Sequence, residues 1–227
     1  MAQLFPPYAN TLARLALPAL GCGLVAVAWG VHTALFSSYT TEVAVPKAQP
    51  VPFSHQHHVG ELGIDCRYCH TGVEDSALAG LPATEICMTC HSQIWRDAPV
   101  LEPVRESWRT GRPLRWTRVY DLPDYVAFDH SIHVRKGIGC VSCHGRVDQM
   151  PLTAKAASLY MRWCLECHRN PERHRQLPSE VFTMRDEPPE GFAALRSKTQ
   201  SPPAPQMSAT ETFPHGHRLE DCSICHR

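Results

Sequence analysis

The sequence predicts a chain built mostly of loops and short α-helices, preceded by one membrane-spanning helix. Three observations support this fold class. An apolar stretch occupies residues 15–36, the 227 residues include 20 prolines and 13 glycines, and the pattern Cys-x-x-Cys-His occurs five times after that stretch. Because prolines and glycines interrupt helices and strands, we expect irregular backbone between the five patterns.

The apolar stretch has the length of one membrane-crossing helix. Its 22 residues include no formally charged side chain, and it is longer than the apolar region of a typical cleaved signal peptide. Arg14 precedes it, which favours a cytoplasmic N-terminus. We therefore expect residues 1–14 to be cytoplasmic, residues 15–36 to span the membrane once, and residues 37–52 to form a linker.

Cys22 lies inside this stretch and does not belong to any of the five patterns. The residues before it, Ala19-Leu20-Gly21, resemble a lipoprotein cleavage box. A mature lipoprotein usually turns polar after its cysteine, whereas mostly apolar residues follow here. We expect Cys22 to be an inert small residue of the helix, with lipidation as the alternative.

The other ten cysteines all belong to the Cys-x-x-Cys-His patterns, which are attachment sequences for c-type haem. Two thiols form thioethers to one porphyrin, and the histidine that follows binds its iron as the proximal ligand. The attachment cysteines are Cys66, Cys69, Cys87, Cys90, Cys140, Cys143, Cys164, Cys167, Cys222 and Cys225. The proximal histidines are His70, His91, His144, His168 and His226.

Zinc and disulfides are the competing interpretations of these cysteines. Zinc sites pair two Cys-x-x-Cys knuckles per metal, so five knuckles is an unsuitable number. Neither zinc knuckles nor disulfides require a histidine after every pair. We therefore expect five c-type haems. Since c-type haem is attached outside the bacterial cytoplasm, residues 53–227 should lie on the periplasmic or extracellular side of the bacterial inner membrane.

Five haems leave about 35 residues for each, too few to enclose every porphyrin in its own apolar shell. We therefore expect a haem-cored domain in which the cofactors pack on one another. The chain has 22 basic and 22 acidic residues, so its charge does not suggest nucleic acid as a partner.

An internal repeat supplies candidates for the second, distal iron ligands. The pattern Phe-x-His-x-x-His precedes the first and third attachment motifs, and a shortened form precedes the fifth, which gives repeats over 53–91, 128–168 and 213–226. Histidines three apart face one side of a helix, so one pair can serve two neighbouring haems. The predicted distal ligands are His55, His58, His130, His133 and His215. Alternative distal ligands are Met150 and Met161, because a His/Met haem is the main rival type.

This repeat resembles the small multihaem cytochromes of the c3 and c7 type. The resemblance implies that His55, His130 and His215 bind the haems at Cys66, Cys140 and Cys222. It leaves open which of the other two haems His58 and His133 reach. With five distal candidates for five haems and no Cys-x-x-Cys-Lys motif, we expect an electron carrier with six-coordinate irons and not an enzyme.

A narrower resemblance rests on residues 52–95, 115–151, 163–172 and 221–227. Together with the N-terminal helix, they resemble the membrane-anchored pentahaem cytochrome of bacterial alternative complex III. The resemblance implies respiratory or photosynthetic electron transfer. In that family electrons from polytopic quinol-oxidising subunits pass through an iron–sulfur molybdoenzyme-like subunit to the pentahaem subunit. They continue to a monohaem cytochrome c subunit, then to a soluble cytochrome c, a blue copper protein or a terminal oxidase.

The main rival function is a stand-alone membrane-anchored multihaem quinol dehydrogenase that feeds a periplasmic reductase. Such a chain would hold the quinol site itself. The first attachment motif lies about 30 residues after the apolar stretch, which argues mildly against this rival, because it would require a haem at the membrane face.

Overall fold

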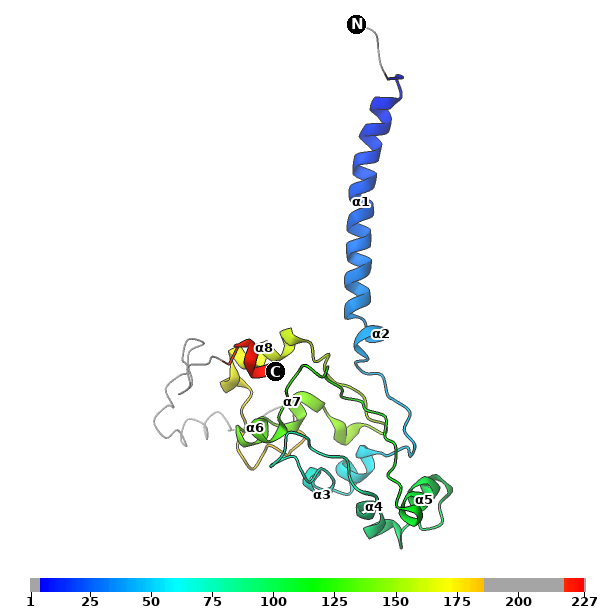
Figure 1. Cartoon of the computed structure of the whole chain (residues 1–227), viewed down its shortest axis with the longest axis vertical. Helices are drawn as coiled ribbons and strands as arrows, with labels where there is room; N and C mark the ends of the chain where they lie inside the picture. The colour runs from blue at the N-terminus through cyan, green and yellow to red at the C-terminus, as the bar shows by residue number, and fades with distance from the viewer. Residues whose placement is uncertain (1–4, 186–218, 227) are drawn as a thin grey trace, which may run out of the picture. The chain divides into compact units, whose positions relative to one another are not determined.

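The computed structural model describes residues 5–185 and 219–226. In this part of the chain the regular elements are helices, and pairing between extended segments is limited to three isolated β-bridges. The chain divides into two compact units, Met1–Val43 and Ala44–Arg227 (Figure 1). The predominance of short helices and loops agrees with the prediction from composition.

The first unit is a long helix, α1 (Ala9–Phe36), followed by the short α2 (Ser38–Thr41). The helix α1 begins six residues before the predicted span, because the polar turn that precedes the span is also helical and Leu12 N–H donates to the Tyr8 carbonyl at 2.9 Å. Its apolar window has a mean hydropathy of 1.7. By length and composition α1 is able to cross a membrane.

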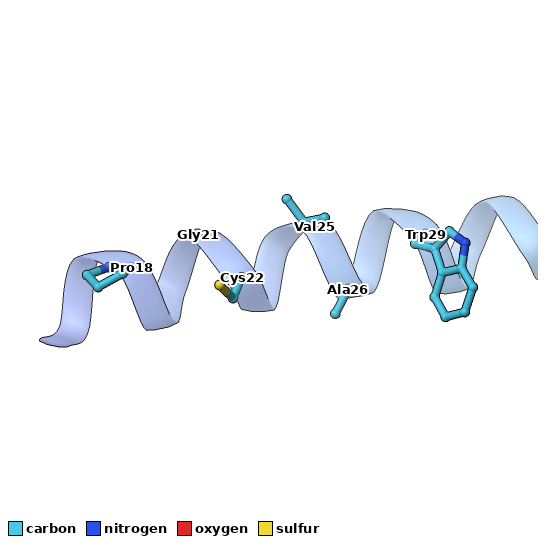
Figure 2. A pocket seen from close by; sticks show the side chains of 6 residues that line it. All are labelled: Pro18, Gly21, Cys22, Val25, Ala26 and Trp29. Carbon is cyan, nitrogen blue, oxygen red and sulfur yellow. The ribbon is translucent and has the colours of Figure 1, made fainter.

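One side of α1 carries several small side chains. Gly21, Cys22 and Ala26 leave a shallow apolar hollow that is bounded by Pro18, Val25 and Trp29 (Figure 2). The spacing of three and four residues places these side chains on neighbouring turns. Cys22 therefore lies on the surface of α1, and the side chains beside it in this hollow are all apolar.

The second unit contains eleven short described helices. The first six are η1 (Gln56–Glu61), α3 (Cys66–Cys69), α4 (Thr84–His91), η2 (Pro99–Leu101), α5 (Glu102–Thr110) and α6 (His130–Arg135). The remaining five are α7 (Cys140–His144), η3 (Val147–Gln149), α8 (Met161–Arg169), η4 (Pro171–Arg173) and α10 (Cys222–Cys225). Each of the five Cys-x-x-Cys-His motifs therefore includes a helical turn.

Local sequence explains where two of these helices begin. Asp65 precedes α3 and its carboxylate accepts a hydrogen bond from Arg67 N–H at 2.8 Å. Asp129 precedes α6 and accepts from Ile132 N–H at 3.3 Å. Both are N-caps that satisfy otherwise unpaired backbone donors. One of them fixes the start of an attachment motif and the other fixes the start of a helix with two predicted ligands.

Side chains alone provide the second unit with little apolar core. Its buried hydrophobic residues are few and mostly valines: Val51, Val73, Leu101, Val104, Val141, Val147, Ala154 and Val181. One cluster forms where Val51, Leu101 and Val104 pack against Cys87 and Trp116.

Candidate functional site

Each Cys-x-x-Cys pair lies on one face of a helical turn. Residues i and i+3 are neighbours on a helix surface, so the two thiols of a motif project to the same side. All eleven cysteines lie in the described residues and none forms a disulfide. The disulfide interpretation therefore gains no support from the structure.

Four of the five motif histidines face a second histidine ring across a similar gap. The distances between ring centroids lie between 6.2 and 6.5 Å. The pairs are His55–His70, His58–His91, His130–His144 and His133–His168.

This separation is too large for ring contact and matches two axial ligands of one iron. A metal bonds an imidazole nitrogen at about 2.0–2.1 Å. Two such bonds in line, together with the depth of each ring from nitrogen to centre, separate the ring centroids by about 6.4 Å. The residues present therefore fit a metal that is held between two imidazoles.

Hydrogen bonds fix which nitrogen of each ring faces the gap. In all but one of the eight paired rings, Nδ1 bonds an oxygen of the chain. The partners are Thr153 Oγ1 for His55 (2.9 Å), Ser54 O for His58 (2.8 Å), Gly80 O for His70 (2.7 Å), Ile94 O for His91 (3.0 Å), Ala77 O for His130 (2.9 Å), Asp129 O for His133 (2.7 Å) and Leu219 O for His168 (2.9 Å). A carbonyl partner requires a proton on Nδ1, which leaves Nε2 as the free lone pair for a metal.

Burial keeps several of these rings neutral. Desolvation, and then the neighbouring His70 and His58, lower the pKa of His55 to about 4. Desolvation, followed by His130, His70 and His55, lowers the pKa of His144 to about 4. At neutral pH both imidazoles are unprotonated, which is the form that binds a metal.

One phenylalanine orients both distal candidates in each full repeat. Phe53 lies edge-on to His55 (centroids 4.9 Å apart, 87°) and stacks on His58 (4.4 Å, 25°). Phe128 repeats this geometry with His130 (4.8 Å, 90°) and His133 (4.5 Å, 27°). The Phe-x-His-x-x-His pattern was noted in the sequence, but the ring contacts explain why its first position is aromatic.

The fifth motif is only partly described. His226 Nδ1 lies 3.3 Å from the Tyr125 carbonyl, and Val126 and His226 form an isolated β-bridge. The predicted distal ligand His215 lies outside the described residues. The prediction for this site therefore rests on sequence.

In the four described sites, a histidine and neither Met150 nor Met161 lies opposite the motif histidine. Each of the four described pairs brings a motif histidine to another histidine. The Met150 carbonyl accepts a hydrogen bond from Gln56 N–H at 3.1 Å. Met161 is 63% exposed at the start of α8.

The zinc interpretation also lacks a geometric basis. Within residues 5–185 and 219–226, no three side chains of the His, Cys, Asp or Glu type converge as they would around a metal ion. Zinc requires four ligands in structural sites. The described geometry is instead that of facing imidazole pairs beside cysteine pairs.

Two supporting features were not foreseen from sequence. The Tyr120 hydroxyl donates to the Cys143 carbonyl (3.2 Å) and accepts from Ala156 N–H (2.7 Å), and its ring packs against His144. Val181 and Phe182 contact two attachment motifs at once. Tyr120 lies in an aromatic-rich segment, but nothing in the sequence signals which motif that segment approaches.

Comparison with known proteins gives one informative similarity. No family model matches the chain. The chain is 38% identical over 99 residues to a protein of Nitratidesulfovibrio vulgaris named "Menaquinone reductase, multiheme cytochrome c subunit". The matched region is 43% of this chain and 46% of the relative, so the chain spans less than half of that protein. The similarity supports a multihaem c-type cytochrome and does not extend to alternative complex III.

Proposed function

We propose that this chain is a membrane-anchored pentahaem c-type cytochrome that carries electrons within a quinone-linked membrane complex. The observation that carries the proposal is the set of four facing histidine pairs, with ring centroids 6.2–6.5 Å apart, each beside a Cys-x-x-Cys pair. When bound, each haem supplies a one-electron iron couple. The chain contributes attachment, axial ligands and protection from solvent.

The ligand assignment follows the ring pairs. We assign His70 with His55 to the motif at Cys66, and His91 with His58 to the motif at Cys87. We assign His144 with His130 to the motif at Cys140, and His168 with His133 to the motif at Cys164. The motif at Cys222 has His226, and His215 remains its predicted partner. The distal histidines thus serve the first and second motifs of each repeat in the same order.

Two imidazoles on each iron favour electron transfer over catalysis. A haem that binds a small-molecule substrate requires an open axial position, and paired histidines occupy both positions. The anchored Nδ1 atoms hold the rings in place, so changes of iron charge need little rearrangement of the chain. This supports an electron carrier and not an enzyme.

The scarcity of buried side chains supports a haem-cored domain. The described buried hydrophobic residues of the second unit are six valines, one leucine and one alanine. Such a core is too small to stabilise a unit of this length. Bound porphyrins supply the missing apolar contacts, so attachment and folding should be coupled.

In finer detail, we propose a place in a complex of the alternative complex III type. The pentahaem subunit would then lie on the periplasmic side of the bacterial inner membrane, anchored by α1. It would take electrons from an iron–sulfur molybdoenzyme-like subunit that is served by polytopic quinol-oxidising subunits. It would deliver them to a monohaem cytochrome c subunit or to a soluble cytochrome c or blue copper acceptor. The resemblance over the attachment motifs and the single apolar helix support this placement.

A second candidate has the opposite direction of electron flow. The relative's name describes a menaquinone reductase, so the same relay could pass electrons from a periplasmic donor towards menaquinone. The chemistry of the five haem sites is the same in both cases, because a bis-histidine haem accepts and donates electrons alike. The partners decide the direction.

Gentle detergent extraction from native membranes tests these functions. Co-purification of an iron–sulfur subunit, polytopic subunits and a monohaem cytochrome, with quinol-dependent reduction of a soluble acceptor, supports the first candidate. Menaquinone reduction by a reduced cytochrome donor supports the second. If the chain is isolated alone or with one periplasmic reductase and accepts electrons from quinol directly, the stand-alone dehydrogenase replaces both. A haem count other than five, by pyridine haemochrome assay and intact mass, refutes the pentahaem proposal itself.

A further inference from the structure

We infer that the five attachment motifs form one unbranched series that does not follow their order in the sequence. Named by their first cysteines, the motifs lie in the order Cys87, Cys66, Cys140, Cys164 and Cys222. This inference rests on the proposed function, since it concerns the path between haem sites. It is carried by separate contacts at each of the four steps.

The step between the motifs at Cys87 and Cys66 is made by their inner residues and by a shared ligand segment. Tyr68 lies inside the motif at Cys66 and Thr89 inside the motif at Cys87, and their side-chain oxygens are 2.9 Å apart. His55 and His58 lie three residues apart and face the proximal rings of these two motifs. The two sites are therefore neighbours.

The step between the motifs at Cys66 and Cys140 crosses from one repeat to the other. The Val181 carbonyl accepts from Cys140 N–H at 2.9 Å, and the next carbonyl, that of Phe182, lies 3.9 Å from Cys66 Sγ. Two consecutive residues thus contact both motifs.

The histidine pairs of these two motifs are held together as well. The Ala77 carbonyl, seven residues after His70, accepts from both the backbone N–H and the Nδ1 of His130. Arg135, on the same helix α6, bonds Asp75 at 3.0 Å. The segment that follows His70 is therefore bonded to the helix that carries His130.

The step between the motifs at Cys140 and Cys164 repeats the first step in the second repeat. His130 and His133, both on α6, face the proximal rings of these motifs. The two sites are therefore neighbours.

The step between the motifs at Cys164 and Cys222 is made by residues beside the proximal ligand. His168 Nδ1 donates to the Leu219 carbonyl at 2.9 Å, and Arg169 lies 3.4 Å from the Glu220 carboxylate. Leu219 and Glu220 lie three and two residues before Cys222. Figure 1 shows the red C-terminal helix beside α8.

Exposure of the thiols agrees with the two ends of the series. Among the ten motif cysteines, only Cys90 and Cys222 are exposed, and the others are partly buried. Cys90 belongs to the first motif of the series and Cys222 to the last. The terminal sites are therefore the ones most open to partner proteins.

The direct test is the location of the five irons in the wild-type holoprotein by anomalous diffraction at the iron edge. We expect an unbranched file in which the iron at Cys66 lies between those at Cys87 and Cys140. An iron at Cys87 nearer to that at Cys140 or Cys164 than to that at Cys66 overturns the inference, as does a branched arrangement. A protein with fewer than five irons refutes the proposed function instead, so the two failures are distinguishable.

A solution test uses one variant at an end and one in the interior. His58→Met and His130→Met each raise the potential of one haem, so that this haem is reduced first and its added charge lowers the potentials of its neighbours. We expect a shift at the Cys66 site alone for His58→Met, and at both the Cys66 and Cys164 sites for His130→Met. NMR-monitored redox titration resolves the sites. If the largest shift in reduction potential occurs at any other site, the proposed order is wrong. If a variant loses its haem, the diffraction experiment still tests the order.

Discussion

The neighbouring residues His55, His57 and His58 allow the sharpest test of which histidines bind the irons. His55 and His58 face the proximal rings of two different motifs. His57, between them, is exposed and bonds Glu61 at 2.8 Å instead. Substituting each of the three by glycine changes the same stretch of backbone, so His57→Gly is a matched control for the other two.

The expected magnitude follows from the geometry. His55 and His70 are separated by the distance expected for two imidazoles that bind one metal. Without the His55 ring, one of the five irons would lose an axial ligand. We expect one molecule of carbon monoxide bound per reduced His55→Gly chain, and about one fifth of the haem converted to high spin. His58→Gly should give the same stoichiometry at a different site, and His57→Gly and the wild type should bind none.

The folding cost should not obscure this result. His55→Gly loses one hydrogen bond to Thr153 and one edge-on contact with Phe53, which together contribute about 1–3 kcal/mol. His57→Gly loses an exposed hydrogen bond to Glu61 and an edge-on ring contact with His58 at 5.4 Å, which together contribute about 0.5–2 kcal/mol. Glycine itself adds about 0.5–1 kcal/mol to both.

Carbon monoxide titration, electron paramagnetic resonance and added imidazole complete the assay. Free imidazole should occupy the vacated space in His55→Gly and restore the low-spin spectrum. The assignment is refuted if His57→Gly binds carbon monoxide, or if His55→Gly keeps five low-spin haems without added imidazole.

Three further predictions concern the spectra and the supporting side chains. The ring planes of His55–His70 and His130–His144 are nearly parallel (3° and 13°), whereas those of His58–His91 are inclined by 65°; the oxidised protein should therefore show both rhombic and highly anisotropic low-spin signals, and His58→Gly should abolish an anisotropic one. Phe128→Leu keeps apolar bulk but removes two aromatic contacts worth about 0.5–1.5 kcal/mol each, so redox titration should show shifted potentials at the Cys140 and Cys164 sites and unchanged ones at the Cys87 site. Tyr120→Phe loses two hydrogen bonds and should lower the free energy of unfolding by about 1–3 kcal/mol in urea titrations, whereas the exposed Tyr125→Phe should change it by less than about 0.5 kcal/mol.

Spacing along the chain predicted the local parts of this molecule well. The apolar run predicted α1, and prolines and glycines predicted short helices in loops. These features depend on neighbouring residues, so a single sequence contains the needed information. The structure extends α1 to Ala9 because helix continuation does not require apolar side chains.

Contacts between segments that are distant in the sequence were harder to predict from the sequence alone. The resemblance to c3- and c7-type cytochromes implied that His55 and His130 serve the first motif of their units, and the structure places His55 opposite His70 and His130 opposite His144. The partners of His58 and His133 were undecided, because several motifs lie within reach of a flexible loop. Tyr120 illustrates the same limit, since its hydroxyl joins Cys143 to Ala156 through a fold that spacing does not reveal.

The contact between repeats explains why the proposed series departs from sequence order. Each repeat presents its first motif, at Cys66 or Cys140, to the same motif of the other copy, as in a self-complementary interface. The second motifs, at Cys87 and Cys164, then lie on the outer sides, and the near-parallel ring pairs belong to the two inner sites while the more inclined ones belong to the outer sites. Two copies alone would give a relay with equivalent ends. The motif at Cys222 extends one end only, through Leu219 and Glu220, so the fifth site makes the two ends different and allows them to meet different partners.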